Sequence, residues 1–217
     1  MLLERDAEVN IQDHDGNTPL HYASKNEEPD FVLMLLDHNA NVQVRNDMGH
    51  TPLQHAVIAG YLEVSRILLQ HNAEIDSSDN HVSTPLLLAS QFGRADLVQL
   101  FIDHNADVHA RDGDGDSSLH CAAVAVGGRG QLEVARLLLQ LNVEVNSRNN
   151  NGTTPLHLAS HGLPDSESGG NPDIVRLLLD HGADVLARNS SGKIAAEIAR
   201  GPKQEDIRQL LSQHAEK

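Results

Sequence analysis

The chain has 217 residues and a formal net charge of −15, because 31 acidic side chains outnumber 16 lysines and arginines. Nucleic acid and anionic membrane surfaces are therefore poor partners, since the basic residues are scattered singly and form no patch. A single cysteine excludes a disulfide framework, and we find neither a signal peptide nor an apolar run near the roughly 18 residues of a membrane span. We expect an intracellular protein, cytoplasmic or nuclear, with no membrane insertion.

The tetrapeptide Thr-Pro-Leu-x returns along the chain at a nearly fixed spacing. It begins at Thr18, Thr51, Thr84 and Thr154, and a degraded copy begins at Ser117. The steps between these positions, in chain order, are 33, 33, 33 and 37 residues. Self-similarity at this period predicts one small unit stacked many times, so that each unit packs only on its neighbours.

The unit at residues 46–78 shows the order of predicted elements. Residues 46–50 have turn composition, Thr51 is a helix cap and Pro52 fits the first helical turn. The helical pattern is broken at Gly60, and residues 62–69 then form a second amphipathic helix. The unit is therefore a turn, a helix, a loop, a second helix and an extended turn.

This pattern resembles the ankyrin repeat, and the resemblance covers essentially the whole chain. It implies an all-α ankyrin-repeat solenoid of stacked helix-turn-helix units, with short β-hairpin fingers that line a concave groove together with the first helices. The chain is then a single domain at 1–217, divided into a partial unit at about 1–12, full units at 13–45, 46–78, 79–111, 112–148 and 149–188, and a C-terminal cap at 189–217.

Several departures from the pattern carry their own expectations. Val82 stands where the other fingers have Gly, so we expect that finger to be less regular. Insertions at 126–129 and 163–169 should lie side by side on one edge, the longer one being the most mobile internal segment. The chain begins inside an apparent second helix, so we expect the natural protein to extend upstream. Weak self-association is expected at this uncapped end, near Tyr22, Phe31, Val32 and Leu35.

Histidines recur at two positions of the unit, and neither position predicts chemistry. His21, His120 and His157 close the tetrapeptide, and the resemblance gives them a backbone bond that steadies the junction of hairpin and helix. A second column ends the predicted second helices at His38, His71, His104 and His181. Imidazole suits the negative end of a helix, and packed helices about 10 Å apart cannot share metal bonds of about 2 Å.

Other candidates for chemistry are weak. Residues 112–117 resemble the start of a calcium loop, but Ser117 and Ala123 stand where that loop needs Gly and Glu, so an acidic finger tip is favoured over weak cation binding. Cys121 fits a buried structural thiol. No arrangement joins a nucleophile, a base and an oxyanion site, so we predict no enzyme activity, no catalytic residue, no cofactor and no metal site.

Asn10 and Asn146 follow Glu-Val, with Leu2 and Leu138 eight residues before them. This context resembles the one in which an asparaginyl hydroxylase modifies ankyrin repeats, so both residues are candidates for hydroxylation. The alternative is that Asn simply suits a tight turn.

The resemblance places partner contacts on the finger tips and on the exposed ends of the first helices. Carried over unit by unit, the candidate partner-binding residues are Asp15, Asp47, Met48, His50, Ile58, His81, Gln91, Phe92, Asp114, Asp116, Val124, Asn150 and His161. Acidic fingers beside apolar anchors favour a protein or peptide partner with basic and apolar residues. Two alternatives stay open: the chain is the regulatory or targeting portion of a larger enzyme or channel, or a structural spacer without a dedicated partner.

Overall fold

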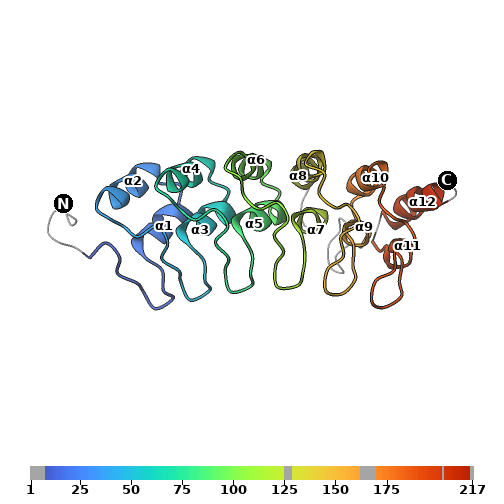
Figure 1. Cartoon of the computed structure of the whole chain (residues 1–217), viewed down its shortest axis with the longest axis horizontal. Coiled ribbons are helices and arrows are strands. Elements are labelled where there is room, and N and C mark those ends of the chain that lie inside the picture. Colours follow the sequence, from blue (N-terminus) through green and yellow to red (C-terminus); the bar gives the residue numbers. More distant parts are fainter. Residues whose placement is uncertain (1–7, 125–128, 162–169, 202, 216–217) are drawn as a thin grey trace.

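The computed structural model describes residues 8–124, 129–161, 170–201 and 203–215. The helices in this part of the chain come in six consecutive pairs (Figure 1). The first helices are α1 (Pro19–Lys25), α3 (Pro52–Ala59), α5 (Pro85–Gln91), α7 (Ser118–Ala123), α9 (Pro155–Ser160) and α11 (Ala195–Ile198). The second helices are α2 (Pro29–Asp37), α4 (Leu62–Gln70), α6 (Ala95–Asp103), α8 (Arg129–Gln140), α10 (Pro172–Asp180) and α12 (Gln204–Ala215).

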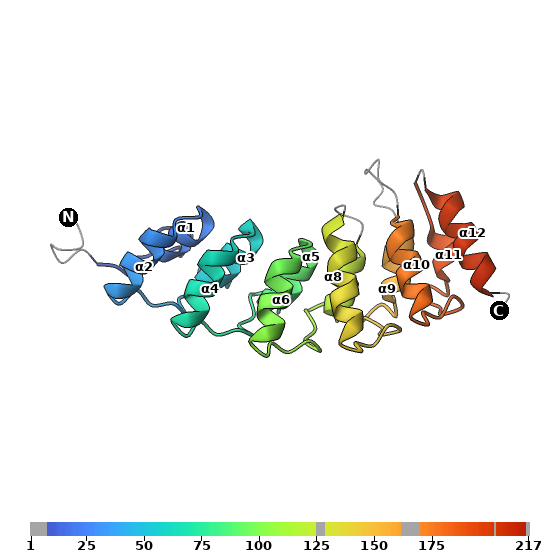
Figure 2. The ribbon, with the colours of Figure 1, turned by 90° about the horizontal axis from the view of Figure 1, so that it is seen from above.

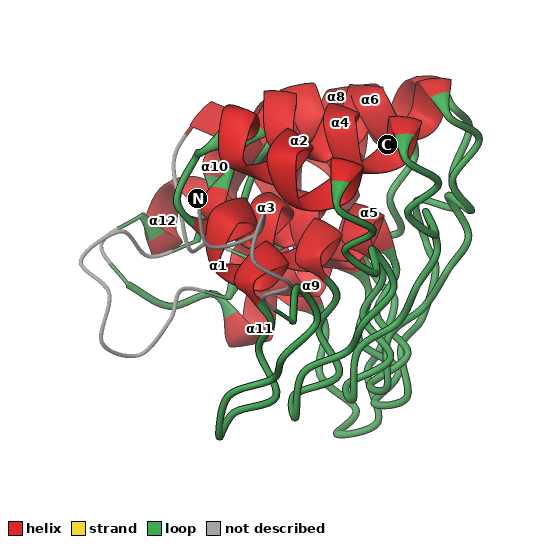
Figure 3. Ribbon diagram, turned by 90° about the vertical axis from the view of Figure 1, so that its left-hand side faces the viewer, coloured by secondary structure: helices red, strands yellow, loops and turns green. Residues whose placement is uncertain are grey.

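The pairs stack in one gently curved row. Figure 1 shows the second helices as one layer and the first helices as the other, with the fingers projecting beyond the first helices. Seen from above, the row bends along its length (Figure 2), and from its N-terminal end the fingers stand away from the helices (Figure 3). The all-α solenoid is confirmed. The expected hairpins are simpler than predicted, because the described residues contain no strand and only one isolated antiparallel bridge, Arg111 with Ser117.

The core is aliphatic and repeats with the unit. The Leu of each tetrapeptide is fully or almost fully buried in this core: Leu20, Leu53, Leu86, Leu119 and Leu156. Phe101 of α6 is the largest fully buried side chain. Burial of this kind stabilises a solenoid one interface at a time, since each unit covers only its neighbours.

The fourth residue of the tetrapeptide ties each unit to the next. Nδ1 of His21 accepts a hydrogen bond from the Thr18 N–H (3.0 Å), and its Nε2–H donates to the His50 carbonyl of the next finger (3.0 Å). Gln54 makes the equivalent bond to the Ser83 carbonyl at 2.8 Å. The same bond to the next finger is made by His120 and His157. Burial lowers the pKa of His21, His120 and His157, and the predicted structural role of these imidazoles is confirmed.

Each finger is a turn closed by its first residue. Oδ1 of Asp79 accepts hydrogen bonds from the backbone N–H groups of His81 and Ser83, at 2.9 and 2.8 Å. The same pair of bonds is made by Asp13, Asn46, Asp112, Asn149 and Asn189. Adjacent fingers are joined by backbone bonds, such as that from Asn80 N–H to the Met48 carbonyl (3.2 Å).

The prediction that Val82 disturbs its finger is wrong. Val82 takes the glycine conformation with φ +63°, and its N–H donates to the Asp79 carbonyl at 3.0 Å, as the glycines do in the other fingers. The turn is fixed from both sides by the Asp79 bonds and by the neighbouring finger. The valine therefore adapts to the turn, at a steric cost that a glycine avoids.

The predicted exposed face of the first full unit, at 13–45, is also partly wrong. Val32 and Leu35, which we expected on an exposed face, are fully or almost fully buried within the core, whereas Tyr22 and Phe31 are exposed. The insertions at 126–129 and 163–169 lie outside the described residues, except for residue 129 at the start of α8. Their expected placement and mobility therefore stay predictions. Within the described part of the chain, every helix is too short or too polar to cross a membrane.

Candidate partner-binding groove

The groove between the fingers and the first helices contains three consecutive hollows. The first hollow, of about 570 Å³, lies between the units at 13–45 and 46–78. Met48 and Ile58 supply its apolar surface, and charged side chains stand on its rim. Five predicted contact residues line it: Asp15, Asp47, Met48, His50 and Ile58.

The second hollow, of about 520 Å³, lies one unit further along. Its apolar surface comes from Ile58, Leu88, Phe92 and Val82, and it shares His50 and Ile58 with the first hollow. The other predicted contact residues that line it are His81, Gln91, Phe92 and Asp114. The shared walls make the two hollows one continuous channel across the fingers.

The third hollow is smaller, at about 160 Å³, and three aspartates line it: Asp112, Asp114 and Asp116. The second hollow is likewise lined by three aspartates. Asp114 and Asp116 face Val124 and Gln91 across it, so four predicted residues meet there. Asn150 and His161, which were also predicted as contact residues, line none of these three hollows.

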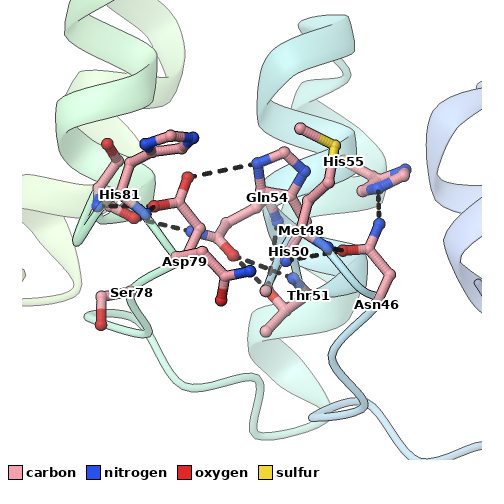
Figure 4. Close-up of polar contacts among 12 residues, drawn as sticks. Asn46, Met48, His50, Thr51, Gln54, His55, Ser78, Asp79 and His81 are labelled. Carbon is pink, nitrogen blue, oxygen red and sulfur yellow. Dashed lines mark hydrogen bonds and ion pairs between the residues drawn. The ribbon is translucent and has the colours of Figure 1, made fainter. Parts of the chain in front are cut away.

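A cluster of three imidazoles lies at the first hollow. The ring of His55 is edge-on to His21 and to His50, with centroids 5.2 and 5.6 Å apart. The amide of Asn46 donates to Nε2 of His55 (3.1 Å), as Figure 4 shows. Burial, followed by the positive charges that His21, His50 and Lys25 can carry, lowers the pKa of His55 to about 4.

A contact between His50 and Asp79 joins this finger to the next one. His50 Nε2 lies 3.3 Å from a carboxylate oxygen of Asp79, and both side chains are largely buried (Figure 4). Asp116 is also engaged, because its carboxylate accepts from the Asn149 amide at 2.7 Å. Asp15, Asp47 and Asp114 are exposed instead.

The apolar candidates differ in their degree of exposure. Phe92, at the C-terminal end of α5, keeps 43% of its surface exposed, and Met48 is more exposed still. Ile58 is only partly exposed and packs against the core. Ile58, predicted as a contact residue at the exposed end of a first helix, therefore also supports the core, because helical spacing alone does not distinguish a groove wall from the edge of the core.

Several residues that line the hollows are absent from the predicted contact residues, among them Asn46, His55, Val82, Leu87 and Leu88. His55 and Leu88 both follow the fourth residue of the tetrapeptide, and this position faces the hollow shared with the preceding unit. The signal was present in the alignment of the repeats, where the position holds Tyr22, His55, Leu88 and Cys121 in successive units.

The remaining candidates have structural partners. Oδ1 of Asn146 accepts from the Asp184 N–H (2.8 Å), and its amide donates to the Gly182 carbonyl (3.1 Å). Asn10 bridges to the end of the unit at 13–45 in the same way: its Oδ1 accepts from the Asn41 N–H and its amide donates to the Asn39 carbonyl. Hydroxylation of either residue would require these bonds to open.

Two further features bear on the candidates for chemistry: the Cys121 thiol and the grouping of possible metal ligands. Burial raises the pKa of the Cys121 thiol well above its usual range, which leaves it unreactive. In the described segments, no three His, Cys, Asp or Glu side chains are grouped to hold a metal ion.

The chain belongs to the ankyrin-repeat family. The family profile for ankyrin repeats (three copies) matches residues 1–79, 78–149 and 124–217. Among solved structures, the human ASB11 ankyrin repeat domain superposes with a TM-score of 0.83 at 23% identity, covering 98% of this chain and 90% of that one. This likeness concerns the fold alone. A search of curated protein sequences finds no match. Ankyrin repeats are generally non-catalytic modules for protein–protein interaction.

Proposed function

We propose that this chain is a non-catalytic binding module that holds a partner protein or peptide in its concave groove. The observation that carries the proposal is the continuity of the three hollows, which share lining residues. The first two expose apolar side chains beside carboxylates, and the third is mainly polar. A groove that is concave, apolar at its base and charged at its rim has the anatomy of a recognition surface.

The chemistry of the groove favours a partner with basic and apolar residues. Lys or Arg side chains on the partner would face Asp15, Asp47 and Asp114. Its apolar side chains would be buried from water by packing against Met48 and Phe92. The net charge of −15 disfavours nucleic acid. The proposal includes an intracellular setting, cytoplasmic or nuclear, which is supported by the single buried cysteine.

Two rival interpretations predict different results. If the chain is the regulatory portion of a larger enzyme or channel, the groove binds a segment of that same protein. If the chain is only a spacer, changing the groove alters no interaction.

The test compares two charge reversals on opposite faces. The groove variant is Asp15→Lys with Asp47→Lys, and the matched control is Asp37→Lys with Asp180→Lys, at the exposed ends of α2 and α10. Affinity purification with quantitative mass spectrometry should give partners that the control variant retains and the groove variant loses. Equal capture by wild type and both variants would reject the groove, and capture of nothing by any of them would favour the spacer.

A further inference from the structure

The unit at residues 79–111 departs from the repeat at three positions that border the second and third hollows. It carries Val82 where the other fingers have Gly, Leu87 where the other units have a polar residue, and Phe92 where earlier units have Asn26 and Ala59. Because the equivalent positions of the other units provide the same backbone, each departure can be compared directly with the residue that the fold prefers.

Val82 is the first departure, and it works against the fold. Its φ of +63° lies in the left-handed region, which is unfavourable for a β-branched residue. Half of the side chain stays exposed, so burial does not offset the strain. The exposed part of the valine lines the second hollow.

Leu87 is the second departure. The residues at this position in other units, such as His21 and His120, bond to the carbonyl of the next finger. A leucine has no polar atom to make that bond, so the unit gives up a link to its neighbour. Leu87 instead forms part of the third hollow, and the adjacent Leu88 forms part of the second.

Phe92 is the third departure. An aromatic ring that keeps 43% of its surface in water contributes little to folding, and this ring lines the second hollow. Rings in such positions typically gain their energy when a partner covers them.

Strain, a missing bond and an exposed ring have separate physical origins, yet each departure places an apolar residue beside the same part of the groove. Val82 and Phe92 expose apolar surface in the second hollow, whereas Leu87 is almost fully buried in the wall of the third. We propose that the second hollow is a dedicated pocket for one bulky apolar side chain of an extended partner segment, which also carries a Lys or Arg within about two residues. The basic residue follows from charge complementarity, because Asp112 and Asp114 border both the second and the third hollow. This inference rests on the proposed function, since it places the partner within the same groove.

The probe is a library of random linear peptides displayed on phage and selected on the whole chain. Enriched peptides should share a bulky aliphatic or aromatic residue next to a basic one. Their affinity is then measured by fluorescence polarisation, using synthetic peptides. Enriched sequences that lack either residue would overturn the inference.

The decisive variant restores the repeat: Val82→Gly, Leu87→His and Phe92→Ala together. Restoring the pattern removes strain and supplies the missing bond, so we expect a higher melting temperature and an affinity for the selected peptides that is lower by about tenfold or more. The matched control is Glu27→Gly, which relieves a positive φ of 55° in the unit at 13–45, away from the second hollow. The control should also melt higher, with unchanged affinity.

The outcomes separate this inference from the broader proposal. If Asp15→Lys with Asp47→Lys weakens peptide binding and the restored variant does not, the groove is correct and the dedicated pocket is wrong. If neither variant changes the binding of the enriched peptides, both are wrong. If no peptide is enriched, the dedicated pocket is wrong, and the groove is judged by the capture experiment alone. If the restored variant melts below wild type, the departures serve the fold and the inference is rejected.

Discussion

His55 is the histidine whose charge the fold opposes most clearly. Its Nε2 accepts from the Asn46 amide (3.1 Å), and that amide is held in place because its oxygen accepts from the N–H groups of Met48 and His50. A proton on Nε2 would therefore face an N–H group. We consider the substitution His55→Leu, since Leu88 occupies the equivalent position of the next unit.

The sign and size of the effect follow from the pKa of His55. The pKa is about 4 in the folded protein, below the usual value of 6.5, so the unfolded chain binds more protons. Stability is therefore lost as pH falls from about 6.5 toward 4. The full pKa shift would lower the free energy of unfolding by roughly 2 kcal/mol between pH 7.5 and pH 5. Because the ring borders an open hollow, solvent screening reduces this to about 1 kcal/mol.

Urea denaturation at pH 7.5 and pH 5 measures the effect. Relative to wild type, the His55→Leu variant should be more stable at pH 5 than at pH 7.5, by about 1 kcal/mol. The control His109→Leu replaces an exposed histidine and should follow the wild-type pH dependence. Parallel curves for wild type and His55→Leu would show that the fold does not oppose the charge on this ring.

Three further predictions test the packing. His120→Leu should lower the free energy of unfolding by about 1–3 kcal/mol, because it removes the bond to the next finger. His120→Gln should lower it much less, since Gln54 makes the equivalent bond in its own unit, and equal losses of the two variants in thermal unfolding would contradict this. Glu27→Gly should raise stability by about 0.5–1 kcal/mol and the melting temperature by a few degrees, whereas a fall would show that its left-handed conformation is not strained. Ile58→Ala should lower the free energy of unfolding by about 1–2 kcal/mol, whereas Phe92→Ala should change it by no more than about 0.5 kcal/mol. Equal losses in urea denaturation would refute this difference in burial.

The sequence was sufficient for the fold because the period repeats one set of local rules. A cap such as Thr51, a proline in the first turn and a buried Leu53 recur with nearly constant spacing, and each copy supports the others. The Val82 prediction failed because it considered the residue alone. The bonds to Asp79 and to the neighbouring finger fix the turn more strongly than the valine side chain can distort it.

The groove was harder to predict than the fold. The position of a residue within the repeat was enough to place Asp47 and Phe92 in the groove, and both residues line its hollows in the structure. It could not show that Ile58 also supports the core, or that His55 and Leu88 reach the hollow of the preceding unit. Those facts depend on how far one helix pair is rotated against the next, and no single unit contains that information.

The position of His55 shows how one repeated site acquires different properties along the array. In the first full unit the same position holds Tyr22, whose hydroxyl donates to Asp13 at 2.5 Å, and in the second it holds His55, bonded to Asn46. Leu88 in the third unit cannot make such a bond to its finger. The first hollow thus has a wall that is fixed by polar contacts and sensitive to protons. At the second hollow the same position holds a largely buried leucine, and the exposed apolar surface comes from Val82 and Phe92. We therefore expect partner side chains of different chemistry in the two hollows, although both are built from the same backbone.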